Sequence, residues 1–310
     1  MTPLFRAAAL AVAAAFLFNL ETVLAKALGE LPIPVLVLAR AAGQLLWAVP
    51  SLFLLGRALL ATEQLPMQIF RGFLSVASWG FYFLSFSRLP LATATVLNFT
   101  SVMFVTALAG PVLKEVVRWR RWGATIIGFL GVLAIVRPGA LPGGLESAWP
   151  IGAAMTSAFI GAVIVLTTKF LARTERTETI MCYIGLVSFA CALPFGLPLL
   201  DWPTPMQALL LLGLAIVGPF AMHLWITALR MADASVLAPI SYVRLVFAVL
   251  SGVLLFGEGL DGWVGLGALL IVGSALYITH REARVAVLKP ATAAAVPQGA
   301  VKGRSTGAPP

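Results

Sequence analysis

The sequence predicts an all-α membrane protein in which ten transmembrane helices form two inverted five-helix repeats. Apolar stretches of about twenty residues follow one another from Leu4 to about Thr279, and each can cross a hydrocarbon core of about 30 Å at a rise of about 1.5 Å per residue. The 310 residues are 60% hydrophobic and only 11% charged, with a mean hydropathy of +0.99. A water-soluble chain of this composition would expose large apolar patches, so lipid is the expected solvent.

Prolines and glycines separate most of the apolar stretches and mark the expected helix boundaries. The connectors are short, so helices that are consecutive in the chain should be antiparallel neighbours in space. The expected spans are residues 4–28, 33–56, 69–87, 91–112, 121–137, 148–171, 178–200, 206–229, 234–256 and 262–280.

Positive charges predict the orientation of these helices, because lysine and arginine are enriched in cytoplasmic loops. With the N-terminus in the cytoplasm, sixteen of the 21 basic residues fall in inner segments and only Lys26, Arg88 and Arg137 fall in outer segments. We therefore expect a multi-pass protein of the cell (inner) membrane with both termini in the cytoplasm. The formal charge of +9 then reflects topology, and no nucleic-acid partner is expected.

The two ends of the chain need separate interpretations. Arg6, the apolar run after it and Val23-Leu24-Ala25 resemble a signal peptide with its cleavage site. Asn19 and Glu21 within that run, and the unpaired half that cleavage would leave, favour a retained first helix. The end of the chain is rich in alanine, proline, glycine and lysine, and is expected to be a disordered cytoplasmic tail. The expected domains are residues 1–140 and 141–284 for the two repeats and 285–310 for the tail.

The two halves of the chain are similar to each other. The segment Arg88-Leu89-Pro90-Leu91-Ala92-Thr93 parallels Arg230-Met231-Ala232-Asp233-Ala234-Ser235. Glu115 matches Glu258 after a slip of one residue, and each glutamate lies just past the end of a span. Because five is an odd number of helices, the second half must enter the membrane from the opposite side. Such inverted repeats are typical of transporters that open a cavity to each side in turn.

At these residues and others the chain resembles the EamA-type members of the drug/metabolite transporter superfamily, over nearly its whole length except the tail. The matching residues of the second half are Thr227-Ala228-Leu229-Arg230, Ala234-Ser235-Val236, Ala238-Pro239, Leu255-Phe256-Gly257-Glu258 and Gly267-Ala268-Leu269-Leu270-Ile271. Those of the first half are Pro34 with Arg40, Phe99-Thr100-Ser101, Arg121-Trp122, Gly128-Phe129-Leu130-Gly131 and Arg137-Pro138-Gly139. Lys114-Glu115 replaces the usual Gly-Glu, and Val102 stands where many members have proline, which argues against a family-like break in the fourth span.

The resemblance implies a ten-helix bundle with a central cavity, lined mainly by helices of both repeats, that moves small organic metabolites. It does not imply one substrate, because members of the superfamily move amino acids, nucleosides, flavins, sugars and other compounds. The direction of transport, the coupling ion and the formation of a homodimer are left open.

Charged residues within the spans are the first candidates for a substrate path, because they are costly to place in lipid. Glu21 lies near the outer end of the first span and Arg40 near the outer start of the second, at matching depths. The two form either a structural ion pair that joins the first two helices or a site at which Glu21 exchanges a proton. Distantly related four-helix exporters use an acidic residue of their first helix for proton exchange, a resemblance at superfamily level only.

Arg244 lies ten residues into the ninth span, about 15 Å deep and close to the bilayer midplane. Ser241 and Ser251 share a polar stripe with it, and Tyr242, a further candidate, lies two residues before it in the chain. Its planar guanidinium suits a carboxylate, phosphate or imide edge of a substrate, whereas hydrogen bonds to backbone carbonyls freed near prolines are the structural alternative. His223 in the eighth span is a further candidate substrate-binding residue, or it is simply hydrogen-bonded.

Uncharged polar residues complete the set of candidate substrate-binding residues. Asn19 lies with Thr22 on a stripe of the first span that leads toward the outer mouth. Ser78 and Tyr82 lie on a face of the third span that would suit a wet cavity. Asn98 in the fourth span needs hydrogen-bond partners within the hydrocarbon, so it should point inward.

The sequence therefore predicts a secondary active transporter of a small organic metabolite that works by alternating access. The solute is expected to be anionic or zwitterionic, for example an amino acid or a flavin. No enzyme is expected, since the only histidines are His223 and His280 and neither a zinc signature nor a nucleophile elbow occurs. No motif for a metal, a cofactor, ATP hydrolysis or a channel filter is found either. The expected partners are the solute and the lipid bilayer, and a lipid scramblase or flippase with a polar groove is the alternative function.

Overall fold

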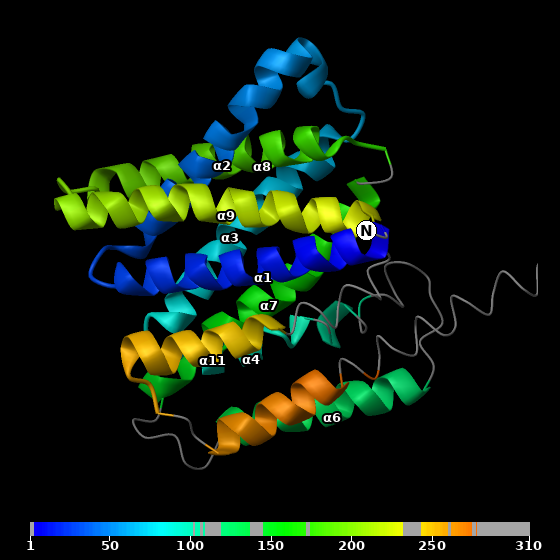
Figure 1. Cartoon of the computed structure of the whole chain (residues 1–310), viewed down its shortest axis with the longest axis vertical. Helices are drawn as coiled ribbons and strands as arrows, with labels where there is room; N and C mark the ends of the chain where they lie inside the picture. The colour runs from blue at the N-terminus through cyan, green and yellow to red at the C-terminus, as the bar shows by residue number, and fades with distance from the viewer. Residues whose placement is uncertain are drawn as a thin grey trace, which may run out of the picture.

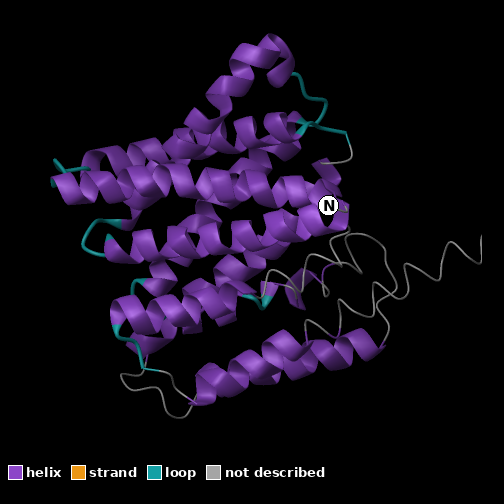
Figure 2. Ribbon diagram, viewed as in Figure 1, coloured by secondary structure: helices purple, strands orange, loops and turns teal. Residues whose placement is uncertain are grey.

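The computed structural model describes residues 3–101, 103–105, 108, 119–136, 145–171, 174–231, 243–259, 262–274 and 277. Within these residues all regular secondary structure is helical (Figure 2). The helices lie side by side, with their axes running across the view of Figure 1. The prediction of an all-α membrane fold is confirmed.

Six helices of the first half of the chain are described. Prolines begin several of them: Pro34 and Pro66 lie in the first turns of α2 and α3, where a missing N–H breaks no helical hydrogen bond. Gly56 ends α2 with φ 53°, a left-handed conformation that favours glycine. The bounds are α1 (Pro3–Ala27), α2 (Ile33–Leu55), the 3-10 helix η1 (Gly56–Leu59), α3 (Leu65–Phe86), α4 (Leu91–Asn98) and α6 (Trp119–Val136).

The second half has the same helical character. Pro150, Pro194 and Pro219 lie inside long helices, a position that membrane helices tolerate when neighbours satisfy the freed backbone groups. The bounds are α7 (Leu145–Leu171), α8 (Thr177–Gly196), the 3-10 helix η2 (Leu197–Leu199), α9 (Pro205–Met231), α11 (Val243–Phe256) and a helix at Gly262–Ser274.

Six of the described helices are long and apolar enough to cross a membrane, and three shorter apolar helices accompany them. Most helices begin and end close to the expected spans, although α3 begins at Leu65 and not at residue 69. Residues 234–242 of the ninth expected span and residues 275–276 and 278–280 of the tenth lie outside the described residues. So do residues 137–144, on which the expected boundary between the two repeats falls, and the expected tail.

The fourth expected span is interrupted near its middle. The helix α4 ends at Asn98, a turn follows, and helical residues resume at Ser101. The Thr100 hydroxyl donates to the Leu97 carbonyl oxygen at 2.7 Å, and the Thr100 amide donates to the same oxygen at 3.1 Å. A hydroxyl that bonds to the nearby backbone competes with the regular helix. The helix is therefore irregular at residues 99–100, while Val102 itself lies outside the described residues.

The contacts between helices follow a pseudo-two-fold exchange of the two halves (Figure 1). Let α1, α2 and α3 change places with α7, α8 and α9, and let α4 and α11 represent the fourth and ninth spans to which they belong. The pair α1–α9 then becomes α7–α3, and α2–α9 becomes α8–α3. The pair α1–α11 likewise becomes α7–α4, while α2–α8 and α4–α11 map onto themselves. All of these pairs are in contact. This is the packing expected of inverted repeats.

Small residues allow close approach where the halves meet. A Cβ added to Gly43 of α2 would overlap the carbonyl oxygen of Ala215 in α9. Pro219, four residues further along α9, has no N–H to bond to that carbonyl. The two helices can therefore pack with their backbones in contact, as small residues permit in membrane bundles.

Candidate functional site

Arg244 of α11 joins the two halves of the bundle through hydroxyl groups. Its Nη2 donates to the Tyr82 hydroxyl of α3 at 2.8 Å and to Thr22 Oγ1 of α1 at 3.1 Å. Thr22 and Tyr82 lie five and four residues before the last residues of their helices, Ala27 and Phe86. At helical rise, the guanidinium therefore lies about 6–8 Å before the C-terminal ends of α1 and α3, closer to these helix ends than the midplane position expected from the sequence.

Aromatic rings lie beside the same guanidinium. The Cζ atom of Arg244 is 5.6 Å from the centre of the Phe18 ring and 5.3 Å from that of Tyr82, within the range of a cation–π interaction. Among the described residues no carboxylate pairs with Arg244. The described hydrogen bonds of this half-buried guanidinium use only Nη2, so its other N–H donors are available, within the described part of the chain, for an incoming acceptor.

The helix pair α1–α11 carries a second polar contact. Asn19 Nδ2 donates to Ser251 Oγ at 2.8 Å. Ser251 lies seven residues after Arg244, and Thr22 lies three residues after Asn19, so both contacts lie on the same two helix faces. The structure therefore brings Asn19 and Arg244 to one seam, the contact of α1 in the first half with α11 in the second half.

The pseudo-symmetric seam, between α4 and α7, also carries polar contacts. Ser157 of α7 donates to the Ser78 carbonyl oxygen at 3.0 Å, and its Oγ lies 3.4 Å from Ser78 Oγ and 3.4 Å from Asn98 Nδ2. Ser78 lies one turn before Tyr82 on α3, so this cluster is next to the Arg244 cluster along that helix. Two contacts of these seams were not predicted from the sequence, namely Ser157 and the Phe18 ring.

Glu21 and Arg40 form a buried ion pair between α1 and α2. Glu21 Oε1 accepts a hydrogen bond from Arg40 Nε, and the two residues are 7% and 0% exposed. Arg40 Nη1 also donates to Gln44 Oε1 at 2.9 Å, and the Trp79 ring of α3 lies 4.4 Å from Arg40 Cζ. The guanidinium is thus surrounded by protein on several sides.

The helix α9 covers the same ion pair from the second half. A Cβ added to Gly218 would overlap Arg40 Nε, so only glycine leaves room for the pair at this crossing. Side chains or backbone of α1, α2, α3 and α9 therefore meet at one buried charge pair. The predicted pairing is present, and the prediction of proton exchange at Glu21 is not tested by it.

Another polar contact joins α1, α4 and the segment after α11 at the end of the bundle where α1 ends. Lys26 Nζ lies 2.5 Å from Glu258 Oε1 and donates to the Leu89 carbonyl oxygen at 3.1 Å. The Glu258 carboxylate also accepts the Leu91 amide, at 2.9 and 3.1 Å, in the first turn of α4. A carboxylate at a helix N-terminus interacts favourably with the helix dipole. Glu258, singled out by the internal repeat, thus ties the second half to both α1 and α4.

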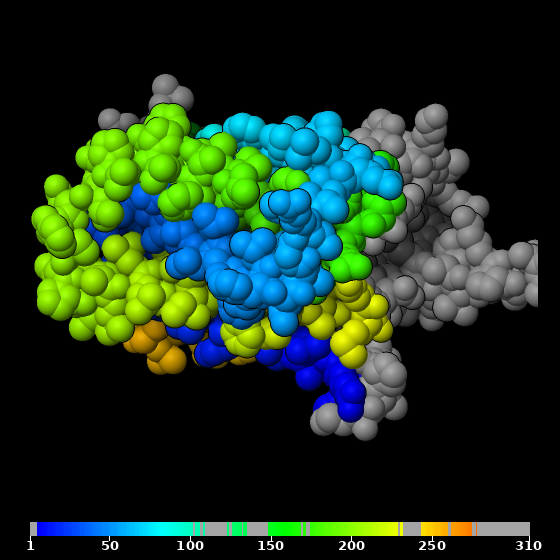
Figure 3. Space-filling model, turned by 90° about the horizontal axis from the view of Figure 1, so that it is seen from above, coloured from blue at the N-terminus to red at the C-terminus, as the bar shows by residue number. Residues whose placement is uncertain are grey.

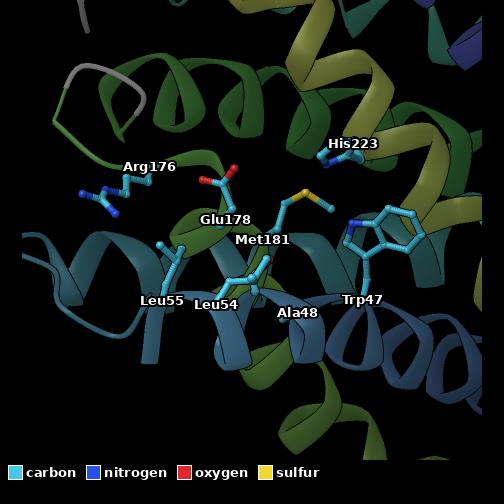
Figure 4. Close-up of a pocket in the computed structure, with 9 residues that line it drawn as sticks. Trp47, Ala48, Leu54, Leu55, Arg176, Glu178, Met181 and His223 are labelled. Carbon is cyan, nitrogen blue, oxygen red and sulfur yellow. The ribbon is translucent and has the colours of Figure 1, made fainter. Parts of the chain in front are cut away.

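His223 does not lie with these residues. It packs against Trp47 of α2, with ring centres 5.7 Å apart, and lines a pocket of about 360 Å³ between α2, α8 and α9. Figure 4 shows Met181 between Glu178 and His223, with Trp47 beside the histidine. The structure therefore separates His223 from Arg244. Ser241 and Tyr242, the remaining candidates, lie outside the described residues.

The described residues contain no group of three or more His, Cys, Asp or Glu side chains that could hold a metal ion. The polar groups of the α1–α11 and α4–α7 contacts are hydroxyls, side-chain amides, the Ser78 carbonyl and the guanidinium of Arg244. Such groups bind and orient a solute, and the guanidinium adds a positive charge.

The model of the EamA-like transporter family matches the chain twice, over residues 5–137 and 148–280. The chain belongs to the EamA-like transporter family. The two matches agree with the pseudo-two-fold exchange of helix contacts, so the internal repeat and the ten-helix fold inferred from the sequence are confirmed.

Several relatives match most of this EamA-like chain. The riboflavin transporter of Vibrio cholerae is 32% identical over 259 residues, covering 82% of this chain and 85% of that protein. The S-adenosylmethionine uptake transporter of Rickettsia prowazekii is 27% identical over 237 residues, covering 76% and 78%. A solved crystal structure with 19% identity and a TM-score of 0.65 covers 90% of this chain and 98% of its own, and shows the fold alone.

Proposed function

We propose that this EamA-like protein is a secondary active transporter that moves a small organic metabolite across the cell (inner) membrane by alternating access of its two inverted halves. The observation that carries the proposal is Arg244, whose guanidinium bridges α1, α3 and α11 without a carboxylate partner among the described residues. An ionisable group inside membrane helices is costly and typically marks a substrate path.

The surroundings of Arg244 favour a flat solute with an acceptor group. The guanidinium offers paired N–H donors to a carboxylate or imide edge, and the Phe18 and Tyr82 rings offer faces for a ring system. Relatives are named as riboflavin and S-adenosylmethionine transporters. Both of those compounds combine a flat heterocycle with a group that a guanidinium can bind. We infer a solute that carries a planar ring and an acceptor group, and an anionic or zwitterionic compound fits the positive charge of Arg244 best.

The outer contact of Lys26, Glu258 and the Leu91 amide supports alternating access. It joins α1 and α4 of the first half to the end of α11 in the second half. Opening the outer end requires these groups to separate, and the reverse motion closes it. The Glu21–Arg40 pair, by contrast, is buried among four helices. It acts as a structural connection that holds the two halves together.

Metabolite profiling tests this function. Cells with and without the protein should differ in the level of one small metabolite, measured inside and outside the cell. Arg244→Ala should abolish the difference while membrane insertion is retained, and the exposed Arg88→Ala is the matched control that should leave it unchanged. An undiminished difference with Arg244→Ala would remove this residue from the site. Movement of labelled phospholipid in reconstituted vesicles, without movement of the metabolite, would favour the scramblase instead.

A further inference from the structure

The pocket that contains His223 lies on the side of the bundle and is separate from the Arg244 seam. Its lining comes from the last turns of α2, the first turn of α8 and one residue of α9. From Trp47 to Leu55 it follows α2 for about 12 Å at helical rise. Figure 3 views this side of the molecule and shows part of α2 exposed between α8 and α9.

This pocket is a groove that opens toward lipid. The helices run across the view of Figure 1, so the face seen in Figure 3 is a lateral face of the bundle. Leu54, which lines the groove, is 85% exposed, and its neighbour Phe53 is also 85% exposed. Apolar side chains this exposed on a membrane bundle are expected to contact acyl chains.

Two opposite charges lie at the end of the groove where α8 begins. Arg176 is the N-cap residue of α8 and is exposed, and Glu178 lies in the first turn (Figure 4). Neither forms an ion pair with another described residue. No side chain caps the first N–H groups of α8, so the helix end adds partial positive charge beside Arg176. This end of the groove offers a cation and an anion within one helical turn.

We propose that the groove binds a phospholipid with a primary ammonium headgroup, that is, a phosphatidylethanolamine. The phosphate binds at Arg176 and the N-terminus of α8, and the ammonium binds at the Glu178 carboxylate. The apolar wall formed by Trp47, Leu54 and Met181 covers an acyl chain. Basic pockets between membrane helices on the cytoplasmic side are known to suit lipid headgroups. The Glu178 carboxylate should make this groove prefer an ethanolamine headgroup.

The chemistry predicts a ranking of lipids. Phosphatidylcholine carries a quaternary ammonium, which has no N–H to donate to Glu178. Phosphatidylglycerol has no cation at all and would bring its negative headgroup toward the carboxylate. A charge-assisted hydrogen bond of the usual strength corresponds to a preference of about tenfold for phosphatidylethanolamine over phosphatidylcholine.

Native mass spectrometry of the purified full-length protein tests the proposal. Each of the three lipids, with identical acyl chains, is added to the delipidated protein, and retained lipid is counted. One phosphatidylethanolamine per chain should be retained about tenfold better than phosphatidylcholine. Glu178→Gln should reduce that preference to about one, and Arg176→Gln should lower retention of all three lipids. Arg57→Gln and Glu63→Gln, at exposed positions of the same end that do not line the pocket, are the matched controls and should change nothing.

A second readout locates the lipid. Brominated phosphatidylethanolamine should quench part of the tryptophan fluorescence, and Trp47→Phe should remove that part. Equal retention of the ethanolamine and choline lipids, an unchanged preference in Glu178→Gln, or quenching that survives Trp47→Phe would each overturn the proposal. A protein dimer in place of a lipid adduct would assign the groove to a second copy of the chain. None of these readouts involves transport, so their failure is distinct from a failure of the proposed function.

Discussion

The buried pair of Glu21 and Arg40 allows a structural role to be separated from proton coupling. Glu21→Ala removes the carboxylate and leaves Arg40 charged, 0% exposed and with Gln44 Oε1 as its remaining side-chain acceptor. Glu21→Gln keeps an oxygen near Arg40 Nε but removes the negative charge. The pair of substitutions therefore compares loss of the partner with loss of its charge.

The expected magnitude follows from the burial. Removal of one partner of a buried ion pair costs about 3–5 kcal/mol, because the other charge is left without compensation. A hydrogen bond to a charged group contributes about 1.5–3 kcal/mol, so Glu21→Gln should cost less than Glu21→Ala. Replacing both residues by apolar ones, as in Glu21→Leu with Arg40→Met, should restore much of the lost stability.

Unfolding of the purified protein in detergent micelles, followed by helical circular dichroism, measures these differences. Glu30, exposed in the turn after α1, supplies the control Glu30→Ala, which should stay within about 0.5 kcal/mol of the unmodified protein. The structural role is refuted if Glu21→Ala and Glu21→Gln leave stability within that same margin. Loss of transport driven by a pH gradient in those stable variants would then identify Glu21 as a proton-exchange site.

Three further predictions concern transport and packing. Tyr82→Phe removes one hydrogen bond to Arg244 but keeps the ring, so substrate affinity should fall about fivefold, read as a raised KM with an unchanged amount of protein in the membrane; an unchanged KM would contradict it. Glu258→Gln weakens the outer closure, so a cysteine placed at Thr22 should react faster with an external, impermeant maleimide in a cysteine-free background; an equal rate would argue against the closure. Gly43→Ala overlaps the backbone of α9 and should lower stability by about 1–3 kcal/mol in the micelle assay, whereas no change would show that the helices move apart freely.

The fold could be predicted from the sequence because a bilayer constrains helices by length and polarity alone. Apolar runs bounded by prolines placed α1, α2 and α9 within a few residues of their ends. The break after Asn98 escaped prediction, since a threonine hydroxyl that bonds to its own backbone leaves no signal as clear as a proline.

The candidate site was predicted in part. Depth matching along two helices was enough to pair Glu21 with Arg40, since both positions can be counted from the same membrane surface. Counting residues gives the depth of a side chain but not the neighbouring helix toward which it points. His223 was therefore predicted to bind substrate together with Arg244, although α9 turns it toward α2. Ser157 is a lone serine among small residues, and only the packing of α7 on α3 shows its role.

The most direct test of the central claim is counterflow in vesicles reconstituted with the purified protein, using the metabolite that profiling identifies. Vesicles preloaded with unlabelled metabolite should accumulate the labelled compound. Arg244→Ala should reduce that accumulation at least tenfold, as expected for loss of a charge-assisted contact to the solute, while Arg88→Ala retains it. Equal accumulation by Arg244→Ala and the unmodified protein would contradict the account.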